Sequence, residues 1–404
     1  MSSTLHAASP ATAAAHGSTD LRALVITGDF PPHLGGIGDY SEKLALAMNK
    51  LPGVTCDVLT TRDGRDDGVA RPFNVMRNVP AWTIKHRKLI LDVARQYDVV
   101  NIQYPGNAYG RKPLINLLPG LIRAQAKHVA STVTIHDFRV MSWQWRLRTW
   151  PMLNAVDGVV HVDAGDWPVI KRWIQRPGGA KSVCVPIASN VDVLPCSPAD
   201  RAAWRGDLNI APDELAIAYF GVIYLHKGLD ELFDAAARVR ASTGRKIRTV
   251  VLGDFDRDEP WVVPLRNRIQ TEPSTTWVRG ASLDQVSRGL HASDLCALPF
   301  HSGTSVNRSS MLAALAHGLP TVTTRGHVTP PNILDQFDLL LVEPKNVDQL
   351  TTAIERLVTQ TDLREKMRAS SVEPHRQVTW DAVARKTAAF FESLKHTRTG
   401  ARAS

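Results

Sequence analysis

The segment GDFPPHLGGIGDYSEKLALAM, at residues 28–48, leads from a short apolar run into an amphipathic helical pattern through two prolines and three closely spaced glycines. The run before it, RALVITG at 22–28, is apolar enough for a strand that is buried on both faces. A glycine turn of this kind brings the backbone N–H groups of the following helix close to a ligand, and such groups suit a phosphate. A surface turn that merely uses glycine is the open alternative. The segment lacks the third glycine of the dinucleotide-binding GxGxxG pattern.

Strand and helix patterns alternate along the chain in two series, which is typical of parallel sheets covered by helices. The expected strands of the first series are at 22–28, 54–60, 98–104, 128–136 and 158–162, and those of the second series are at 215–221, 247–253, 275–280, 294–300, 320–324 and 339–344. A Pro- and Asp-rich stretch at 185–200 lies between the two series and indicates a linker. We therefore predict an α/β protein with two Rossmann-like, doubly wound parallel-sheet domains.

The predicted boundaries follow from these patterns. Residues 1–20 are expected to be a flexible tail, 21–187 an N-terminal Rossmann-like domain and 188–378 a C-terminal Rossmann-like domain, for which the resemblance described below implies acceptor binding and nucleotide-sugar binding, respectively. Residues 379–404 are expected to form a C-terminal helix that crosses back to the first domain. The length of 404 residues agrees with two or three domains of ordinary size.

Composition narrows the classes of function. No apolar run reaches the roughly 18 residues of a membrane-spanning helix, and the first twenty residues resemble no export signal. The four cysteines match no metal-binding spacing, so reduced thiols in a cytoplasm are expected. We predict a cytoplasmic protein, with peripheral binding at the inner face of the cytoplasmic membrane as a further expectation.

The net charge of +9 is concentrated in the first half, where residues 1–195 hold 22 Lys and Arg against 15 Asp and Glu. A basic surface suits nucleic acid, anionic lipid or a phosphorylated substrate. The chain has no zinc finger, RNA-binding aromatic motif or P-loop, so we expect no nucleic-acid partner.

Two further loops enter helices after strands of the second series. In YFGVIYLHKGLDELFDAA, at 219–236, Lys227 stands at the helix start, where a lysine can reach a diphosphate oxygen; an exposed, solvated lysine is the alternative. In HSGTSVNRSSMLAALAHGLPTVTT, at 301–324, Arg308 and the backbone amides suit an anion, whereas a plain helix cap by Ser305 or Asn307 is the alternative.

These stretches, in this order, resemble the GT-B nucleotide-sugar glycosyltransferases, specifically family 4 of the retaining group. The matching motifs are PPHLGGIGDYSEKLALAM at 31–48, TIHDF at 134–138, KGLDELFDAA at 227–236, VRGASLDQV at 278–286, LAALAHGLPTVTT at 312–324, LLVEPKNVDQLTTAIERLV at 340–358 and TWDAVA at 379–384. The resemblance covers residues 22 to 396. It implies two facing domains with the active site in the cleft between them.

The resemblance also implies site residues. Its donor-binding positions are Gly35, Gly36, Ile37, Gly221, Lys227, Val278, Arg279, Gly280, Ser305, Asn307, Arg308, Ser309 and Ser310. The expected catalytic residues are His136, Lys227 and Arg308. The expected acceptor-binding residues are Asp39, Tyr40, Tyr104, His136 and Asp137. An ordinary strand-end histidine is the alternative interpretation of His136.

The chain departs from the family at three positions. Val222 stands where an arginine usually follows the glycine of a strand, and Ser305 and Ala313 stand where the family usually has two glutamates with seven residues between them. We expect Arg308, Ser309 and Ser310 to compensate. The missing glutamates also support an alternative function, a catalytically impaired GT-B-like binding or scaffolding subunit. An NAD-dependent enzyme is disfavoured because the GxGxxG pattern is absent.

The expected reaction moves a sugar from a nucleoside diphosphate to a saccharide or lipid-linked saccharide acceptor in polysaccharide or glycolipid assembly. No DxD motif is placed to hold a metal, so we expect no metal and no cofactor, with cations and helix N-termini stabilising the departing diphosphate. The resemblance implies retention of configuration, and we favour front-face displacement because no residue identifies itself as a covalent nucleophile. Two facing carboxylates of a glycoside hydrolase are not apparent.

The segments 84–90, 109–127 and 138–153 interleave Arg and Lys with Trp and Leu. This pattern suits an anionic membrane surface and a lipid-diphosphate acceptor. The alternative is that Trp143, Trp145 and Trp150 pack into the domain beneath a rim of solvated arginines.

Overall fold

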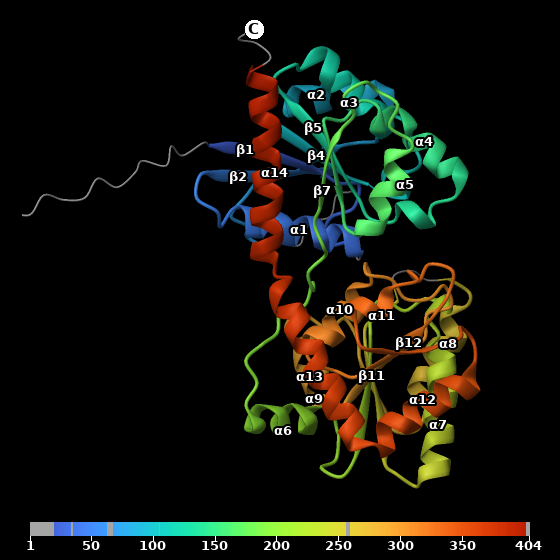
Figure 1. The fold of residues 1–404 in the computed structure, drawn as a ribbon. Helices are drawn as coiled ribbons and strands as arrows, with labels where there is room; N and C mark the ends of the chain where they lie inside the picture. Colours follow the sequence, from blue (N-terminus) through green and yellow to red (C-terminus); the bar gives the residue numbers. More distant parts are fainter. Residues whose placement is uncertain (1–19, 34, 63–67, 105, 256–258, 401–404) are drawn as a thin grey trace, which may run out of the picture.

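The structure is a computed structural model that describes residues 20–33, 35–62, 68–104, 106–255 and 259–400. The predicted tail at 1–20 lies outside these residues except for Asp20. The described chain forms two α/β domains, each built on one parallel sheet (Figure 1). The predicted fold class is therefore confirmed.

The N-terminal domain has, within the described ranges, a seven-stranded sheet in the order β3-β2-β1-β4-β5-β6-β7. Its strands are β1 (Leu21–Ile26), β2 (Val54–Thr61), β3 (Val75–Val79), β4 (Val99–Tyr104), β5 (Ala130–Ile135), β6 (Gly158–His161) and β7 (Lys181–Cys184). Its helices are α1 (Gly36–Met48), α2 (Arg87–Ala94), α3 (Leu114–Gln125), α4 (Trp143–Leu153) and α5 (Trp167–Lys171). Every residue of β4, β5 and β6 is buried, as expected for central strands covered on both faces.

The C-terminal domain has, in the part of the chain described, a six-stranded sheet in the order β10-β9-β8-β11-β12-β13. Its strands are β8 (Leu215–Phe220), β9 (Ile247–Leu252), β10 (Thr275–Val278), β11 (Leu295–Leu298), β12 (Thr321–Thr324) and β13 (Leu339–Val342). Its helices are α6 (Pro198–Asp207), α7 (Leu229–Thr243), α8 (Val262–Thr271), α9 (Leu283–Ala292), α10 (Ser309–Ala316), α11 (Ile333–Gln336), α12 (Val347–Thr359) and α13 (Thr361–Gln377).

Two segments connect the domains. The first runs from the end of β7 to the start of α6, and the second is the passage from α13 to α14 (Trp380–Gly400). Figure 1 shows α14 lying along the N-terminal domain, whereas α13, which directly precedes it in the chain, lies along the C-terminal domain. Phe390, Phe391 and Leu394 of α14 are buried in the core that β1 and α1 share, and Lys395 Nζ lies 2.9 Å from Asp98 Oδ2.

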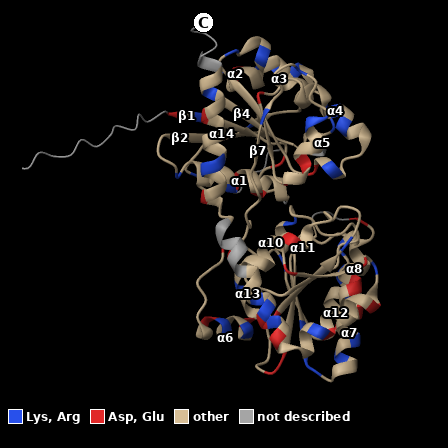
Figure 2. Ribbon diagram, in the orientation of Figure 1, with Lys and Arg blue, Asp and Glu red and all other residues tan. Residues whose placement is uncertain are grey.

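The sequence did not predict β3 and β7. Both are edge strands: β3 reads VMRNV and is mostly half-buried, and β7 reads KSVC with its first residue exposed. An edge strand does not need the continuous apolar run by which the inner strands were found. Figure 2 shows Lys and Arg gathered over α2, α3 and α4, on the outer part of the N-terminal domain.

Candidate active site

The loops that follow β1, β8, β9 and β10, together with the start of α10, enclose a cavity of about 360 Å³ between the two domains. Gly35, Gly36 and Asp39 line it from the N-terminal domain. From the C-terminal domain it is lined by Phe220, Gly221, Val222, Tyr224, Lys227, Gly253, Asp254, Gly280, Ala281, Leu283, Val286, Ser309 and Ser310. Carboxyl ends of parallel strands are where open α/β sheets bind ligands. We call this space the donor cavity.

Two cationic side chains lie together beside the donor cavity. The Lys227 ammonium is 4.9 Å from the centre of the Phe300 ring, and the Arg308 guanidinium carbon is 4.8 Å from the same centre. Burial, and then the charge of Arg308, lower the pKa of Lys227 to about 8. Within the described part of the chain, neither cation forms an ion pair with a carboxylate. The site therefore holds two cations without a direct carboxylate partner among the described residues, although Asp137 lies close enough to act on the charge of Arg308.

Polar groups of the loop that precedes Arg308 hold its guanidinium in place. Its Nη2 donates to Ser302 Oγ at 2.7 Å and to the carbonyl of Gly303 at 3.3 Å. Its Nε is buried and has no hydrogen-bond partner among the described residues. Burial lowers the pKa of Arg308, although Asp137 opposes this effect. An orphaned buried N–H donor is costly, so a bound acceptor oxygen would stabilise it.

Helix N-termini approach the donor cavity from both domains. α1 begins at Gly36 and α10 at Ser309, and among the described residues no side chain caps the free N–H groups of either helix. Uncapped N–H groups and the helix dipole favour an anion at such a position. Gly228, where α7 begins, has φ +74°, and a Cβ there would lie 2.1 Å from the carbonyl oxygen of Pro299. Only glycine at position 228 therefore allows the loop that carries Lys227 to pack against Pro299, the residue that follows β11.

Asp39 is an unexpected carboxyl in this cationic surrounding. It was predicted to bind the acceptor, whereas the structure places it in the wall of the donor cavity. Burial, with a further contribution from Glu42 and an opposing one from Lys43, raises its pKa to about 7. The carboxyl is consequently about half protonated at neutral pH.

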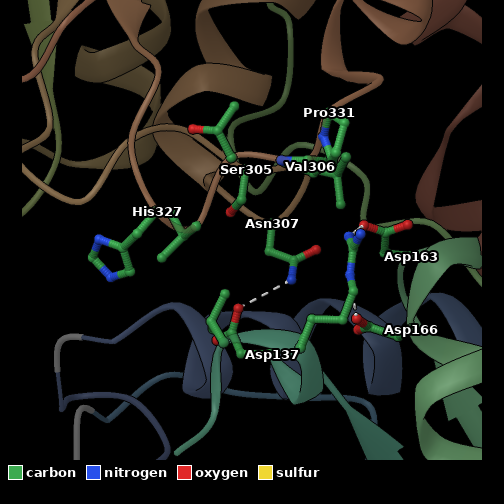
Figure 3. A pocket seen from close by; sticks show the side chains of 13 residues that line it. Asp137, Asp163, Asp166, Ser305, Val306, Asn307, His327 and Pro331 are labelled. Atoms are coloured by element: carbon green, nitrogen blue, oxygen red, sulfur yellow. Dashed lines mark hydrogen bonds and ion pairs between the residues drawn. The ribbon is translucent and has the colours of Figure 1, made fainter.

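A second cavity, of about 300 Å³, lies between the domains along the same loop of residues 305–310 (Figure 3). It is lined by Asp137, Arg139, Val140, Asp163, Asp166, Ser305, Val306, Asn307, His327, Val328, Thr329, Pro330 and Pro331. We call it the acidic cavity. Asn307 joins the domains here, because its Nδ2 donates to the carbonyl of His136 and to Asp137 Oδ1.

Three predicted residues are buried away from both cavities. The Nε2 atom of His136 donates to Gln103 Oε1 at 2.9 Å, and its ring meets Tyr40 edge-on. Burial lowers the pKa of His136 to about 4, so the ring is neutral. Tyr40 is also packed against Trp380, and Tyr104 receives a hydrogen bond from Asn116 within the core. The structure does not support direct acceptor contacts by these two tyrosines, because their hydroxyl groups are enclosed by protein.

Some of the other predicted donor-binding residues line a cavity and others do not. Gly280 lines the donor cavity, whereas Val278 and Arg279 do not, and Arg279 instead lies over Trp277 with its Nε 3.5 Å from Asp254 Oδ2. Ile37 lines neither cavity. Ser305 and Asn307, predicted to bind the donor, line the acidic cavity instead.

Two departures from the family have structural consequences. Ala313, at a usual glutamate position, is fully buried inside α10 and cannot contact a ligand. Val222, at the usual arginine position, lines the donor cavity, where Lys227 is the only described lining residue that is a lysine or arginine. Arg308, predicted to bind the donor, lines neither cavity and lies beside Lys227 over the Phe300 ring.

Sequence reasoning missed Asp254, Asp163 and Asp166. Each follows an expected strand, in GDF at 253–255 or in HVDAGD at 161–166, which is the signal that could have identified them. Among the described residues, no group of three or more His, Cys, Asp or Glu is arranged to hold a metal ion. No helix in the described ranges is long and apolar enough to cross a membrane.

Comparisons with known proteins agree with this geometry. The sequence profile of the family described as Glycosyl transferases group 1 matches residues 200–372. A GDP-mannose-dependent alpha-(1-6)-phosphatidylinositol monomannoside mannosyltransferase of Mycobacterium tuberculosis is 24% identical over 395 residues, which cover 91% of this chain and 97% of that protein. A D-inositol 3-phosphate glycosyltransferase of Actinosynnema mirum is 31% identical over 215 residues, about half of each chain.

Solved structures share the two-domain fold. Anabaena HepE, in complex with UDP and glucose, has a TM-score of 0.71 at 14% identity, with 92% of this chain and 100% of that chain covered. A sucrose-phosphate synthase of Thermosynechococcus elongatus has a TM-score of 0.70 at 17% identity, with 93% and 100% covered. The predicted resemblance to the GT-B glycosyltransferases is confirmed. The chain is a glycosyltransferase of the GT-B type, in which residues 200–372 match the glycosyl transferases group 1 family.

Proposed function

We propose that the chain binds a nucleoside-diphosphate hexose in the donor cavity and transfers the sugar, with retention of configuration, to a saccharide or lipid-linked saccharide. The observation that carries the proposal is the pair of neighbouring cations at Lys227 and Arg308, neither of which forms an ion pair with a carboxylate within the described chain. Two like charges are unfavourable together in the empty site, and a diphosphate between them reverses the sign of the interaction.

The chemistry follows from where charge develops. Breaking the glycosyl phosphate bond places negative charge on the departing diphosphate, and preorganised donors at that point are usually the largest catalytic contribution. Lys227, Arg308 and the N–H groups at the start of α10 are held there before the substrate arrives. We propose that these groups make the reaction independent of a metal ion, and that it needs no other cofactor.

Retention is best explained by front-face displacement. His136 is neutral and hydrogen-bonded to Gln103, so it contributes to the site through the position of its backbone carbonyl and not as a charged group. A departing phosphate oxygen would then accept the proton of the incoming hydroxyl. Product stereochemistry, read from the anomeric NMR signal, tests this part of the proposal.

The relatives guide the choice of substrates. One relative is named for GDP-mannose and a phosphatidylinositol monomannoside, and a solved structure of similar fold contains UDP and glucose. We propose a glycolipid or polysaccharide acceptor and take GDP-mannose and UDP-glucose as the first donors to test.

We also propose peripheral binding to the inner face of the cytoplasmic membrane through α4. Trp143, Leu147 and Trp150 follow the i, i+4, i+7 spacing of one helical face, and Trp143 is 67% exposed. The alternative that these tryptophans pack into the domain is wrong for Trp143 and Trp150. Basic residues on α2, α3 and α4 would complement an anionic lipid surface (Figure 2).

The deciding experiment is turnover of a panel of UDP-, GDP- and ADP-sugars with the purified full chain, measured as nucleoside diphosphate release in EDTA. The proposal expects at least one donor to be consumed, and consumption to increase with a saccharide acceptor. Binding without any turnover would instead favour the impaired scaffolding subunit, which the buried Ala313 supports. A requirement for divalent metal would refute metal independence.

A further inference from the structure

The acidic cavity is lined by three aspartates and one arginine, whereas the donor cavity is lined by Lys227 and two aspartates and has Arg308 beside it. The segment of residues 305–310 contributes to both cavities. Resting on the function proposed above, we infer that the acidic cavity receives the end of the acceptor that is glycosylated, and that this end is an uncharged sugar ring or polyol that carries no phosphate.

Among the described lining residues of the acidic cavity, Arg139 is the only lysine or arginine, and it already has two carboxylate partners. Arg139 Nε donates to Asp166 Oδ1 at 2.9 Å, and Arg139 Nη2 donates to Asp163 Oδ2. The side chains of Asp163 and Asp166 are 10% and 4% exposed, respectively, so the guanidinium is held in place on the wall of the N-terminal domain. Figure 3 shows this ion-paired group at one side of the cavity and His327 at the other. A phosphate that entered would find no free arginine or lysine among the described lining residues.

The carboxylates outnumber the guanidinium by three to one. Asp137 is the third: it accepts a hydrogen bond from the amide of Asn307 at 3.2 Å, forms no ion pair in the described chain, and lies near the charge of Arg308. A phosphate would therefore meet more carboxylates than arginines on the cavity lining, which acts against its binding in a partly buried site. The donor cavity differs in that Lys227 and the neighbouring Arg308 form no ion pair among the described residues, although Asp39 and Asp254 also line that cavity.

The same groups suit hydroxyls. Carboxylate oxygens accept hydrogen bonds, and each sugar hydroxyl can donate one. Asn307 Oδ1 is buried and has no hydrogen-bond partner among the described residues, so it is a further acceptor that an incoming hydroxyl can satisfy. The Ser305 side chain faces the same space (Figure 3). A site built to hydrogen-bond hydroxyl groups discriminates strongly against ligands that leave those groups unpaired.

Size and apolar contacts agree with a single ring. The volume of about 300 Å³ is at the lower end of the range of ligand pockets, about 300 to 1,000 Å³. Val140, Val306, Val328 and Pro330 provide apolar surface between the polar groups, which matches the C–H faces of a sugar or cyclitol. A lipid diphosphate on the acceptor would then lie outside the acidic cavity.

The test uses matched ligand pairs with the nucleoside diphosphate at saturation, so that added phosphate groups cannot occupy the donor cavity. Mannose and mannose 6-phosphate form one pair, and myo-inositol and myo-inositol 3-phosphate form the other. Binding to the full chain is measured by saturation-transfer NMR. We expect a neutral member to bind at least about 10-fold more tightly than its phosphorylated partner.

Two variants test whether the preference for the neutral ligand arises in the acidic cavity. Asp137→Asn should narrow the preference for the neutral member to about 3-fold or less, while leaving nucleoside diphosphate affinity unchanged or higher, because the removed charge lies near Arg308. Asp213→Asn removes an exposed carboxylate elsewhere on the C-terminal domain and should leave the preference unchanged.

Three results would overturn the inference. They are tighter binding of a phosphorylated member than of its neutral partner, no binding of any neutral member while the nucleoside diphosphate binds, and an equal effect of Asp137→Asn and Asp213→Asn. Failure of the nucleoside diphosphate itself to bind would be a different result, because it refutes the proposed donor site.

Discussion

Replacing Lys227 by Met should make the unliganded protein more stable and the enzyme much weaker. Burial and Arg308 hold the pKa of Lys227 at about 8 against an ordinary value near 10.5. The charged form is therefore disfavoured in the folded state. At about 1.4 kcal/mol per pKa unit, the cost at pH 7 is on the order of 3 kcal/mol. Methionine keeps the aliphatic length of the side chain without that cost, so a gain of about 1–3 kcal/mol is expected.

The lowered pKa of Lys227 determines how its destabilising effect on the folded protein changes with pH. The cost is fully present below pH 8 and disappears as pH rises toward 10.5, because the unfolded lysine then also loses its proton. The stabilising effect of Lys227→Met should therefore be largest at neutral pH and vanish near pH 10.5. Thermal melting curves at pH 7 and pH 10 measure it, with an increase of a few degrees expected at pH 7.

Activity should change in the opposite direction. A unit charge about 4 Å from a phosphate oxygen is worth about 4 kcal/mol at an effective dielectric constant near 20, and relief of the repulsion from Arg308 offsets part of it. A net loss of about 2–3 kcal/mol corresponds to a decrease of about 30- to 150-fold in kcat/KM for the donor sugar. Lys246→Met, which removes an exposed lysine paired with Asp213, is the control and should change neither quantity. A Lys227→Met enzyme with unchanged kcat/KM, together with an unchanged Arg308→Ala enzyme, would refute the reasoning.

Four further predictions follow. Nucleoside diphosphate affinity should decrease as pH rises through about 7, where Asp39 loses its proton, and again through about 8, where Lys227 does, because the anion binds the protonated forms better. Calorimetry of Asp39→Asn should show that the decrease near pH 7 has disappeared. Tyr40→Phe should leave kcat/KM within about 2-fold and not reduce stability, since the Tyr40 hydroxyl is buried without a partner in the described chain; a large loss of transfer would show that it contacts substrate. Phe391→Ala should cost about 3–5 kcal/mol of N-terminal domain stability because α14 completes that core, and an unchanged denaturation midpoint would contradict the packing. Trp143→Ala combined with Trp150→Ala should abolish flotation with anionic liposomes but leave transfer to a soluble acceptor intact, whereas unchanged flotation would exclude α4 as the membrane contact.

The fold was predictable where burial imposes a pattern. Inner strands such as VVNIQY at 99–104 are continuously apolar or fully enclosed, so the sequence identified them, whereas the edge strand KSVC at 181–184 carries no such requirement. Glycine loops that follow strands were also identifiable, because chain reversal and close approach require glycine at positions such as Gly228.

The site was predictable in its donor half only. Lys227, Ser309 and Ser310 lie at helix starts that the loops after β8 and β11 lead into, and loops at these strand ends converge on one cavity. The acidic cavity depends on Arg139 reaching Asp163 and Asp166 across a loop, and on Asn307 crossing from the other domain, which no local pattern records. Tyr104 illustrates the opposite error, because it lies at a strand end but faces the core.

The central claim is that fixed cations and helix N-termini hold the diphosphate without a metal ion. Isothermal titration calorimetry of the full chain with UDP, GDP and ADP in EDTA tests it most directly, with Lys227→Met as the matched variant. The account predicts that at least one nucleotide binds in EDTA and that Lys227→Met weakens it by about 30-fold or more. Binding that appears only after Mg²⁺ is added, or that is equal in Lys227→Met, would contradict it.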